Sequence, residues 1–472
     1  MITGVDEMSK EMLIKNGTVV FETDVRKADL YVKDEKIAAI YEPGQAPALD
    51  CETIDATGLY IMPGAIDPHQ HLGLYNSFEE SYKYSTARDV IGGLTSIVEY
   101  HRGKGNYFDT VAEEIAIGEK NSLVDFGISL GLCAKKHMTE LEDYVTKLGI
   151  MSFKFFFDKQ DIAHTFYDIP KEEAMTLDKA DLYYTIKRLK EIDPRLLLCI
   201  HCEDPDMFRA FIKEQQALHP DATGIEEWDA ARPDFVESNC VAGAMLINAE
   251  LNGNIYIVHT SAKKTLDVYK ALSENIDCGK VTIETCPQYL LLDKTIGMDA
   301  KVNPALHDKV DNEALWEGIR SGIVKTIGTD NVPVTRAQKY TRNGKHADNL
   351  WDVWVGFSGQ GIAMPALISE GHLKRGIPLT TISQVLSTNT AKVFNLKDKG
   401  VIRVGADADL ALIDLDWERT ITPELYGCSD FSIYDGMTFR GWPRYTIGRG
   451  EILQKDGVVL AKPGRGKYLK RS

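Results

Sequence analysis

Short apolar runs alternate with longer stretches of helical periodicity through most of this 472-residue chain. The runs lie near residues 61, 95, 126, 152, 196, 254, 281 and 324. Each is followed by a stretch in which apolar residues recur at the spacing of one helix face. Eight such strand–helix units predict a closed parallel barrel with its helices outside. The reactive side chains of a barrel of this kind lie at the C-terminal ends of its strands.

The two ends of the chain have a different, all-β pattern. Short strands are predicted near 19–21, 30–32 and 37–40, and again near 409–413, 445–447 and 458–460. We expect these distant segments to form one small β-sandwich. The predicted domains are residues 1–60, the N-terminal part of the sandwich, residues 61–395, the barrel, and residues 396–472, the C-terminal part of the sandwich with a tail.

The composition excludes several classes of protein. A net charge of −16 disfavours a nucleic-acid surface, which needs clustered basic side chains, and we interpret the basic stretch 465–471 as a solvated tail. The eight cysteines lack regular spacing, so we expect reduced thiols, with Cys199 and Cys202 as packing residues. Residues 1–11 lack the apolar core of a signal peptide, and no run approaches a membrane span. These features predict a cytoplasmic protein without a membrane or nucleic-acid partner.

Two histidines follow the first apolar run at a spacing that suits a metal ion. His69 and His71 are two residues apart, and residues at this spacing face the same side of an extended chain. Two imidazoles that converge from a strand end can hold one divalent cation. The pair alone is also compatible with surface or packed histidines.

Four further residues stand at predicted strand ends or within a strand. Lys154 lies among aromatic residues, where an uncompensated ammonium is costly; a neutral amine can react with carbon dioxide to give a carbamate that bridges two cations. The alternative is a lysine that reaches water on the outer face of the strand. His201 and His259 each end an apolar run, and Asp330 ends the eighth, where it could instead cap the next helix.

The order of these residues resembles a known family. The matching segments are 69–71, 152–154, 201–203, 232–233, 283–290, 328–330, 430–434 and 463–466. Together they are similar to the dihydropyrimidinase and hydantoinase branch of the amidohydrolase superfamily, and the resemblance covers nearly the whole chain.

The resemblance implies a ligand set and a mechanism. His69, His71 and Asp330 would hold one metal ion, His201 and His259 a second, and N6-carboxylated Lys154 would bridge the two. Zinc is the leading metal, while the ligands also suit manganese, cobalt or iron. The two cations would activate a water molecule, and Asp330 would act as general base and then as general acid. The implied partner is a small cyclic ureide, imide or lactam, and the implied assembly is a homotetramer or a homodimer.

Departures from the family pattern fall on the groups that contact the substrate. Lys159 stands where the family has an oxyanion-stabilising tyrosine, a role that Tyr167 could also fill. Segments 303–307, 331–333 and 356–360 differ as well, which puts the substrate contacts of Asn303 and of the later loop in question. Gly73 replaces the carboxylate-binding arginine of many dihydroorotases, so His101, Arg102 and Lys159 become the candidates for that role.

The sequence thus predicts a binuclear metal-dependent hydrolase that opens a cyclic amide with an altered substrate pocket. The alternatives are an allantoinase- or dihydroorotase-like hydrolase, an amidase for acyclic substrates, and a non-catalytic scaffold of the same fold. The complete set of ligands argues against the scaffold, because a protein without catalysis has little chemical reason to keep them.

Overall fold

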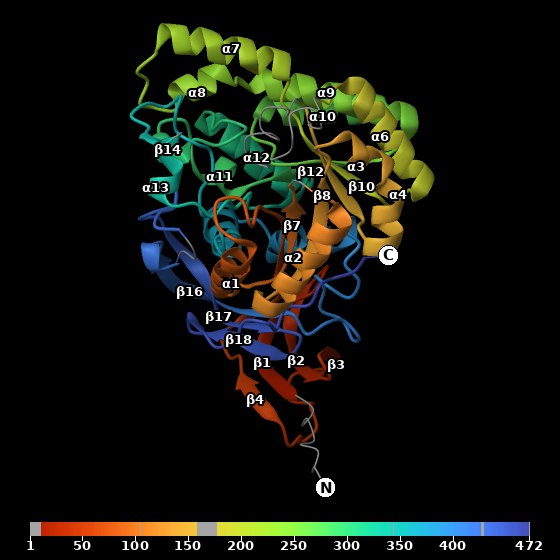
Figure 1. The fold of residues 1–472 in the computed structure, drawn as a ribbon. Coiled ribbons are helices and arrows are strands. Elements are labelled where there is room, and N and C mark those ends of the chain that lie inside the picture. Colours follow the sequence, from red (N-terminus) through yellow and green to blue (C-terminus); the bar gives the residue numbers. More distant parts are fainter. Residues whose placement is uncertain (1–10, 104, 158–176, 343, 426–428, 472) are drawn as a thin grey trace.

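The computed structural model describes residues 11–103, 105–157, 177–342, 344–425 and 429–471 (Figure 1). Two bodies are apparent in Figure 1, a helix-covered barrel and a smaller sheet assembly beneath it that contains both the first and the last strands. This arrangement confirms the predicted fold, a (β/α)8 barrel with a β-sandwich made from both ends of the chain.

The barrel consists of eight parallel strands that pair in sequence order. A bridge from Gln70 to Asn331, together with the hydrogen bond from His71 N to Asn331 O (2.9 Å), joins the first strand to the segment after the last. The strands are β6 (Ala65–Gln70), β7 (Leu94–His101), β8 (Asp125–Gly131), β9 (Ser152–Phe156), β10 (Leu197–His201), β11 (Asn254–Ile257), β12 (Lys280–Thr285) and β13 (Val324–Ile327).

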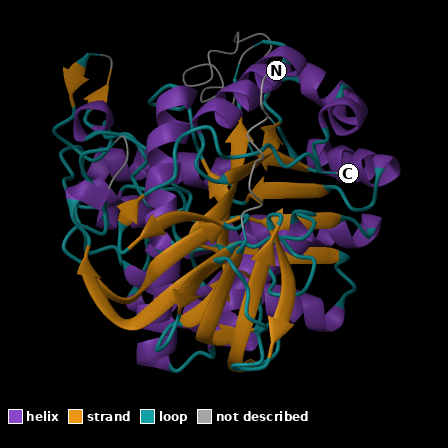
Figure 2. Ribbon diagram, turned by 90° about the horizontal axis from the view of Figure 1, so that it is seen from below, coloured by secondary structure: helices purple, strands orange, loops and turns teal. Residues whose placement is uncertain are grey.

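Helices follow the barrel strands along the chain, and in the view from below the helices lie around and behind the strands (Figure 2). Several begin at side chains that satisfy free backbone amides: Asn106 accepts from Phe108 N, and Asp178 accepts from the amides of Ala180 and Asp181. The longer helices are α1 (Phe78–Asp89), α2 (Tyr107–Asn121), α6 (Lys179–Ile192), α7 (Pro205–Leu218), α8 (Glu226–Ala231), α9 (Asp234–Leu251), α10 (Lys263–Asn275) and α12 (Lys309–Ser321).

Short elements complete the barrel domain. They are the helices α3 (Lys135–Thr139), α4 (Leu141–Asp143), α11 (Pro287–Leu291), α13 (Arg336–Lys339), α14 (Ala363–Ala366), α15 (Leu379–Ser383) and α16 (Asn389–Val393), the 3-10 or π turns η1 (Val90–Gly92), η2 (Tyr144–Leu148), η3 (Met298–Ala300), η4 (Leu367–Lys374) and η5 (Gln384–Thr388), and the hairpin of β14 (Thr341–Arg342) and β15 (Lys345–His346).

The second body is a nine-stranded sheet in which both chain ends pair with each other. It has a separate apolar core that includes Ile14, Val32, Ile61 and Leu412. Its strands are β1 (Met12–Val20), β2 (Val25–Lys33), β3 (Lys36–Tyr41), β4 (Glu52–Asp55), β5 (Tyr60–Pro63), β16 (Leu410–Thr420), β17 (Thr438–Gly448), β18 (Glu451–Lys455) and β19 (Val458–Val459), with the turn η6 (Pro423–Leu425) between β16 and β17.

The apolar run near residue 61 is not a barrel strand. It forms β5, which pairs with β1 and β16 in the sandwich sheet, and the first barrel strand is the next one, β6. Expecting a barrel strand at this run was therefore wrong. The reason is that β5 has the same buried, apolar character as a barrel strand, and only its pairing partners distinguish the two.

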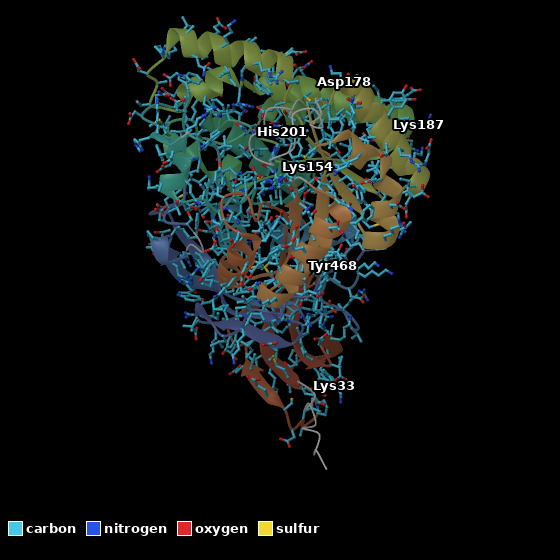
Figure 3. All side chains as sticks on the ribbon, in the orientation of Figure 1. Lys33, Lys154, Asp178, Lys187, His201 and Tyr468 are labelled. Atoms are coloured by element: carbon cyan, nitrogen blue, oxygen red, sulfur yellow. The ribbon has the colours of Figure 1, made fainter. Side chains whose placement is uncertain are left out.

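The interpretation of residues 465–471 as a solvated tail is also wrong. Leu469 N donates to Phe126 O (2.7 Å), and the Tyr468 hydroxyl, labelled in Figure 3, donates to Leu148 O (3.1 Å). Arg471 is only 2% exposed and donates to Ser152 Oγ (2.9 Å). The segment continues the hydrogen bonding at the N-terminal end of β8, which a basic composition alone does not reveal.

Within the described residues, no helix is long and apolar enough to cross a membrane. The described cysteines are free thiols. Cys199 packs inside the barrel, whereas Cys202 packs between the barrel and its helices, so the two thiols belong to different cores, as expected of packing residues.

Candidate active site

His69 lies near the end of β6 and His71 directly after it, and both line the cavity at the C-terminal mouth of the barrel. His69 is fully buried, and its Nδ1 lies 2.8 Å from Glu284 Oε1. Its other nitrogen, Nε2, faces Asp330 Oδ1 at 3.4 Å and Lys154 Nζ at 3.4 Å. Burial, followed by the charge of Lys154, lowers the pKa of His69 well below its usual value. The imidazole is therefore neutral, which is the form that binds metal.

Asp330 closes the same group of ligand atoms. Its Oδ1 lies 2.8 Å from His71 Nε2, and the ligand atoms of His69, His71 and Asp330 all lie within 4.8 Å of one another. Burial raises the pKa of Asp330. The residue has φ +53° and His259 has φ +41°, both in the left-handed region that side-chain-bearing residues seldom adopt. Such strain at two strand ends that face one cavity is typical of functional sites.

Lys154 lies on β9 with its amine inside the barrel mouth. The residue is 1% exposed, and Nζ lies over the rings of Tyr100 (4.9 Å) and Phe156 (5.3 Å). Burial lowers the pKa of Lys154 to about 8. The lysine thus faces the cavity and does not reach water outside the barrel. Figure 3 shows Lys154 and His201 in the same upper part of the molecule, far from Lys33 in the sandwich.

His201 and His259 form a second pair of candidate metal ligands. His201 Nδ1 lies 2.8 Å from His259 Nε2, and His201 Nε2 lies 2.8 Å from Glu203 Oε2. Arg232 donates to the same Glu203 oxygen at 2.7 Å. Burial alone would raise the pKa of Glu203, but Arg232 and His201 together lower it to about 2. Glu203 is therefore a carboxylate that orients the His201 ring.

Two buried carboxylates were not singled out as functional from the sequence. Glu284 accepts from His259 N (2.8 Å) and from the Tyr256 hydroxyl (2.7 Å), in addition to its contact with His69. Asp67 accepts from His69 N (3.1 Å) and from the Thr329 hydroxyl (2.6 Å), which ties the first strand end to the last. Burial raises the pKa of Glu284 to about 7 and that of Asp67 to about 6. In the sequence, Glu284 stands out only as a member of the segment 283–290, which resembles the family pattern.

The remaining candidates for substrate binding differ in whether they line the cavity next to these residues. Arg102 and Asn303 line it, whereas His101 does not. His101 is 2% exposed, and its two ring nitrogens bind Glu114 and the Thr110 hydroxyl, so the structure does not support a substrate-binding role for it. Lys159 and Tyr167 lie outside the described residues. The other lining residues are mostly apolar and include Leu74, Tyr75, Phe156, Val302, Val332, Val355 and Phe357.

Arg102 places a positive charge at the wall of this cavity. Its Nε donates to Tyr100 O (3.2 Å), its guanidinium contacts His71 Nδ1, and it lies 5.9 Å from the centre of the Phe156 ring. Asn331, in contrast, is fully buried, and its side-chain oxygen accepts from Gly359 N (3.0 Å). Asn331, which departs from the family pattern after Asp330, therefore supports the loop at 356–360 and does not line the cavity.

A parallel barrel with histidines, a lysine and an aspartate gathered at its C-terminal mouth defines a class of protein, the barrel hydrolases that use divalent metal. The comparisons with known proteins agree. A model of the amidohydrolase family matches residues 256–453. A D-hydantoinase of Geobacillus stearothermophilus is 30% identical over 482 aligned positions, covering 98% of this chain and 96% of the relative.

Two further relatives span the same length. An allantoinase of Deinococcus radiodurans is 28% identical, with 98% of this chain and 99% of the relative covered. The crystal structure of a dihydropyrimidinase from Brevibacillus agri superposes with a TM-score of 0.87 at 29% identity, covering 98% of this chain and 99% of that one. The chain belongs to the amidohydrolase family, in its hydantoinase-like branch. It is a cyclic amidohydrolase, an enzyme acting on carbon–nitrogen bonds other than peptide bonds.

Proposed function

We propose that this enzyme uses two divalent metal ions to open the ring of a cyclic amide that carries an anionic substituent. The observation that supports the metal centre is the convergence of six side chains from five barrel strands, β6, β9, β10, β11 and β13, at one mouth of the barrel. They are His69, His71, Lys154, His201, His259 and Asp330.

The ring contacts indicate which nitrogen of two histidines faces a metal ion. Glu284 holds Nδ1 of His69, and Glu203 holds Nε2 of His201, so the opposite nitrogen of each ring is turned to the cavity. Burial lowers the pKa of His259 well below its usual value, so this ring is also neutral. Neutral imidazoles beside one carboxylate fit a divalent cation such as zinc, with manganese, cobalt or iron as alternatives.

Lys154 is the proposed bridge between the two ions. Its buried amine has His69 Nε2 as a contact at 3.4 Å, and an ammonium among aromatic rings and histidines is a poor metal ligand. Attack of the neutral amine nitrogen on carbon dioxide forms one N–C bond and releases one proton. The resulting N6-carboxylysine would offer a negatively charged carboxylate group in place of the ammonium, and this group could be shared by two divalent cations.

The chain supplies the remaining parts of the reaction. When bound, the cations would lower the pKa of a water molecule and polarise the amide carbonyl. Asp330, at the edge of the cavity with 14% of its side chain exposed, takes a proton from the attacking water. It then gives this proton to the ring nitrogen as the carbon–nitrogen bond breaks.

The cavity supports an anionic substituent on the ring. Arg102 places a guanidinium beside the His71 end of the proposed metal centre, and the surrounding wall is apolar, which strengthens a charge–charge contact. Asn303 offers an amide for the ring itself. Lys159 remains a proposed second cation. Relatives named allantoinase make allantoin a second substrate to test.

The test is to measure metal content and ring opening with the same preparation. We expect about two metal ions per chain by elemental analysis, and turnover of dihydroorotate or 5-carboxymethylhydantoin well above that of hydantoin or dihydrouracil. Less than one ion per chain after growth in metal-supplemented medium, without activity gained on adding zinc, manganese or cobalt, would contradict the binuclear centre. Preferred turnover of the uncharged rings would contradict the anionic substrate. Size-exclusion chromatography tests the proposed homotetramer or homodimer.

A further inference from the structure

One wall of the cavity is a loop that has little regular structure of its own. Residues 350–357 lie between the β14–β15 hairpin and α14, and Val355, Gly356 and Phe357 of this loop line the cavity. Backbone carbonyls in an irregular loop still need donors when they are buried. The donors here come from two buried lysines and from a tyrosine that also lines the cavity.

Lys339, the last residue of α13, is fully buried behind this loop. Its Nζ donates to Gly356 O at 2.7 Å and lies 3.4 Å from Lys301 O. Its backbone carbonyl also accepts from Trp354 N at 3.0 Å. Lys339 thus contacts the loop through both its side chain and its main chain.

Lys301 holds the earlier part of the same loop. It is 4% exposed, and its Nζ donates to Leu350 O (2.8 Å) and to Val353 O (2.7 Å). The Nζ lies 4.3 Å from the centre of the Trp228 ring. The next two residues along the chain, Val302 and Asn303, line the cavity. One lysine therefore connects two parts of the cavity wall.

These contacts are not those of ordinary lysines. Among the described residues, the hydrogen bonds of both Nζ atoms go to backbone carbonyls and none goes to a carboxylate. Burial lowers the pKa of Lys339 to about 7 and that of Lys301 below its usual value. Burying two such amines without a carboxylate is unfavourable, and apolar side chains would fill the space at lower cost. What only the amines supply is donors for the carbonyls of residues 350, 353 and 356.

On the basis of the function proposed above, we propose that Lys339 and Lys301 are positioning residues that set the substrate-facing wall at 355–357. The carbonyl and the N–H of one trans peptide point in opposite directions, so a Gly356 carbonyl bound to Lys339 turns the Phe357 N–H to the other side. Tyr75 supports the neighbouring peptide, because its hydroxyl donates to Val355 O at 3.1 Å. Gly356 has φ +114°, so the backbone can turn here where another residue would be strained.

The test replaces each amine with a side chain of similar length that lacks a donor. Lys339→Met and Lys301→Met are compared with Lys325→Met, whose exposed lysine lies on the outside of β13. We expect hydrogen–deuterium exchange of the segment 350–357 to be at least about tenfold faster in the first two variants than in the wild type, and unchanged in Lys325→Met. Metal content stays unchanged, since neither lysine touches the proposed ligands.

A kinetic measurement separates positioning from general stability. The expected result for Lys339→Met is a KM raised about tenfold or more for the best cyclic amide of the test panel, with a much smaller change in kcat. Lys339→Gln keeps a donor, and we expect it to recover part of the loss. If Lys339→Met does not fold, Lys301→Met, which also lacks a donor, carries the test. Unchanged exchange in 350–357 with unchanged KM overturns the proposal. If the wild type opens none of the rings, the proposed function fails, while hydrogen exchange still decides the role of the lysines.

Discussion

Replacing Glu284 with glutamine tests whether this buried carboxylate orients a histidine ligand of the proposed metal site. The carboxylate is fully buried and accepts from His69 Nδ1, from His259 N and from the Tyr256 hydroxyl, at 2.8, 2.8 and 2.7 Å. Glutamine has the same shape but only one acceptor oxygen and no charge. That oxygen can still serve His69 and His259, while its NH2 group faces the Tyr256 hydroxyl.

The expected loss follows from the change in acceptor charge. Above the Glu284 pKa of about 7, a hydrogen bond to the charged carboxylate contributes about 1.5–3 kcal/mol and a neutral one about 0.5–1.5 kcal/mol, so at about pH 8.5 the exchange costs about 1.3 kcal/mol at His69. This corresponds to about tenfold weaker metal binding, at the lower end of the effects seen when a group behind a metal ligand is changed. The Glu284→Gln enzyme should therefore fold and bind metal with a Kd raised about ten- to hundredfold.

Competition with a chromophoric chelator measures this Kd directly. Glu250→Gln is the matched control. Glu250 is exposed near the end of α9, so this substitution makes the same chemical change away from the cavity. We expect the control to bind metal as the wild type does. A folded Glu284→Gln protein whose metal affinity stays within about twofold of the wild type would refute the reasoning, since it would show that the bond to His69 does not orient a ligand.

Three further predictions concern single side chains. Lys154→Ala should lose metal and activity, and short carboxylic acids should restore part of the rate; restoration by alkylamines instead would contradict a carbamate. Arg102→Gln should raise KM for dihydroorotate about tenfold or more while leaving dihydrouracil unchanged, because a hydrogen bond to a charged group is lost. For His307, burial lowers the pKa but the bond to Asp229 (2.6 Å) raises it on balance above 6.5. Its contribution to stability is therefore complete below pH 6.5 and falls as pH rises through the higher folded-state pKa. Urea unfolding at about pH 5.5 and about pH 9 should show a larger loss at the lower pH for His307→Gln, and none for the exposed His346→Gln.

The barrel could be predicted because strand position and strand periodicity are local properties of the sequence. Seven of the eight apolar runs used to predict barrel strands lie in or next to barrel strands of the structure, β7 to β13. The first run, which became β5, has the same composition but pairs with β1 and β16. Pairing is a property of the whole fold, and no pattern within the run reports it. The same limit applies to Arg471, because two of its acceptors, Ser152 and Ile128, are 319 and 343 positions away in the sequence.

The error at His101 has a different origin. Side chains alternate along a strand, and Tyr100 of β7 packs inside the barrel, so its neighbour His101 points to the helices, where Glu114 of α2 accepts from it. The alternation of side chains was available from the sequence and would have excluded His101. Glu284 and Asp67 were harder to find, because a buried carboxylate acquires its role only from the donors that the fold brings to it.

The proposed metal ligands and the groups that would contact the substrate lie in different parts of the fold. The proposed metal ligands lie in barrel strands or within three residues of their ends, where the sheet holds their positions, and a change there would remove the proposed means of opening any ring. The groups that would recognise the ring lie on connecting segments, at Arg102, at 302–303 and at 355–357. These segments can change without disturbing the strands. Relatives named D-hydantoinase and allantoinase, at similar identity over nearly the whole chain, are consistent with this separation. Substitutions in the connecting segments of this enzyme should therefore change which cyclic amide is preferred, whereas substitutions at the strand ends should abolish the opening of every ring.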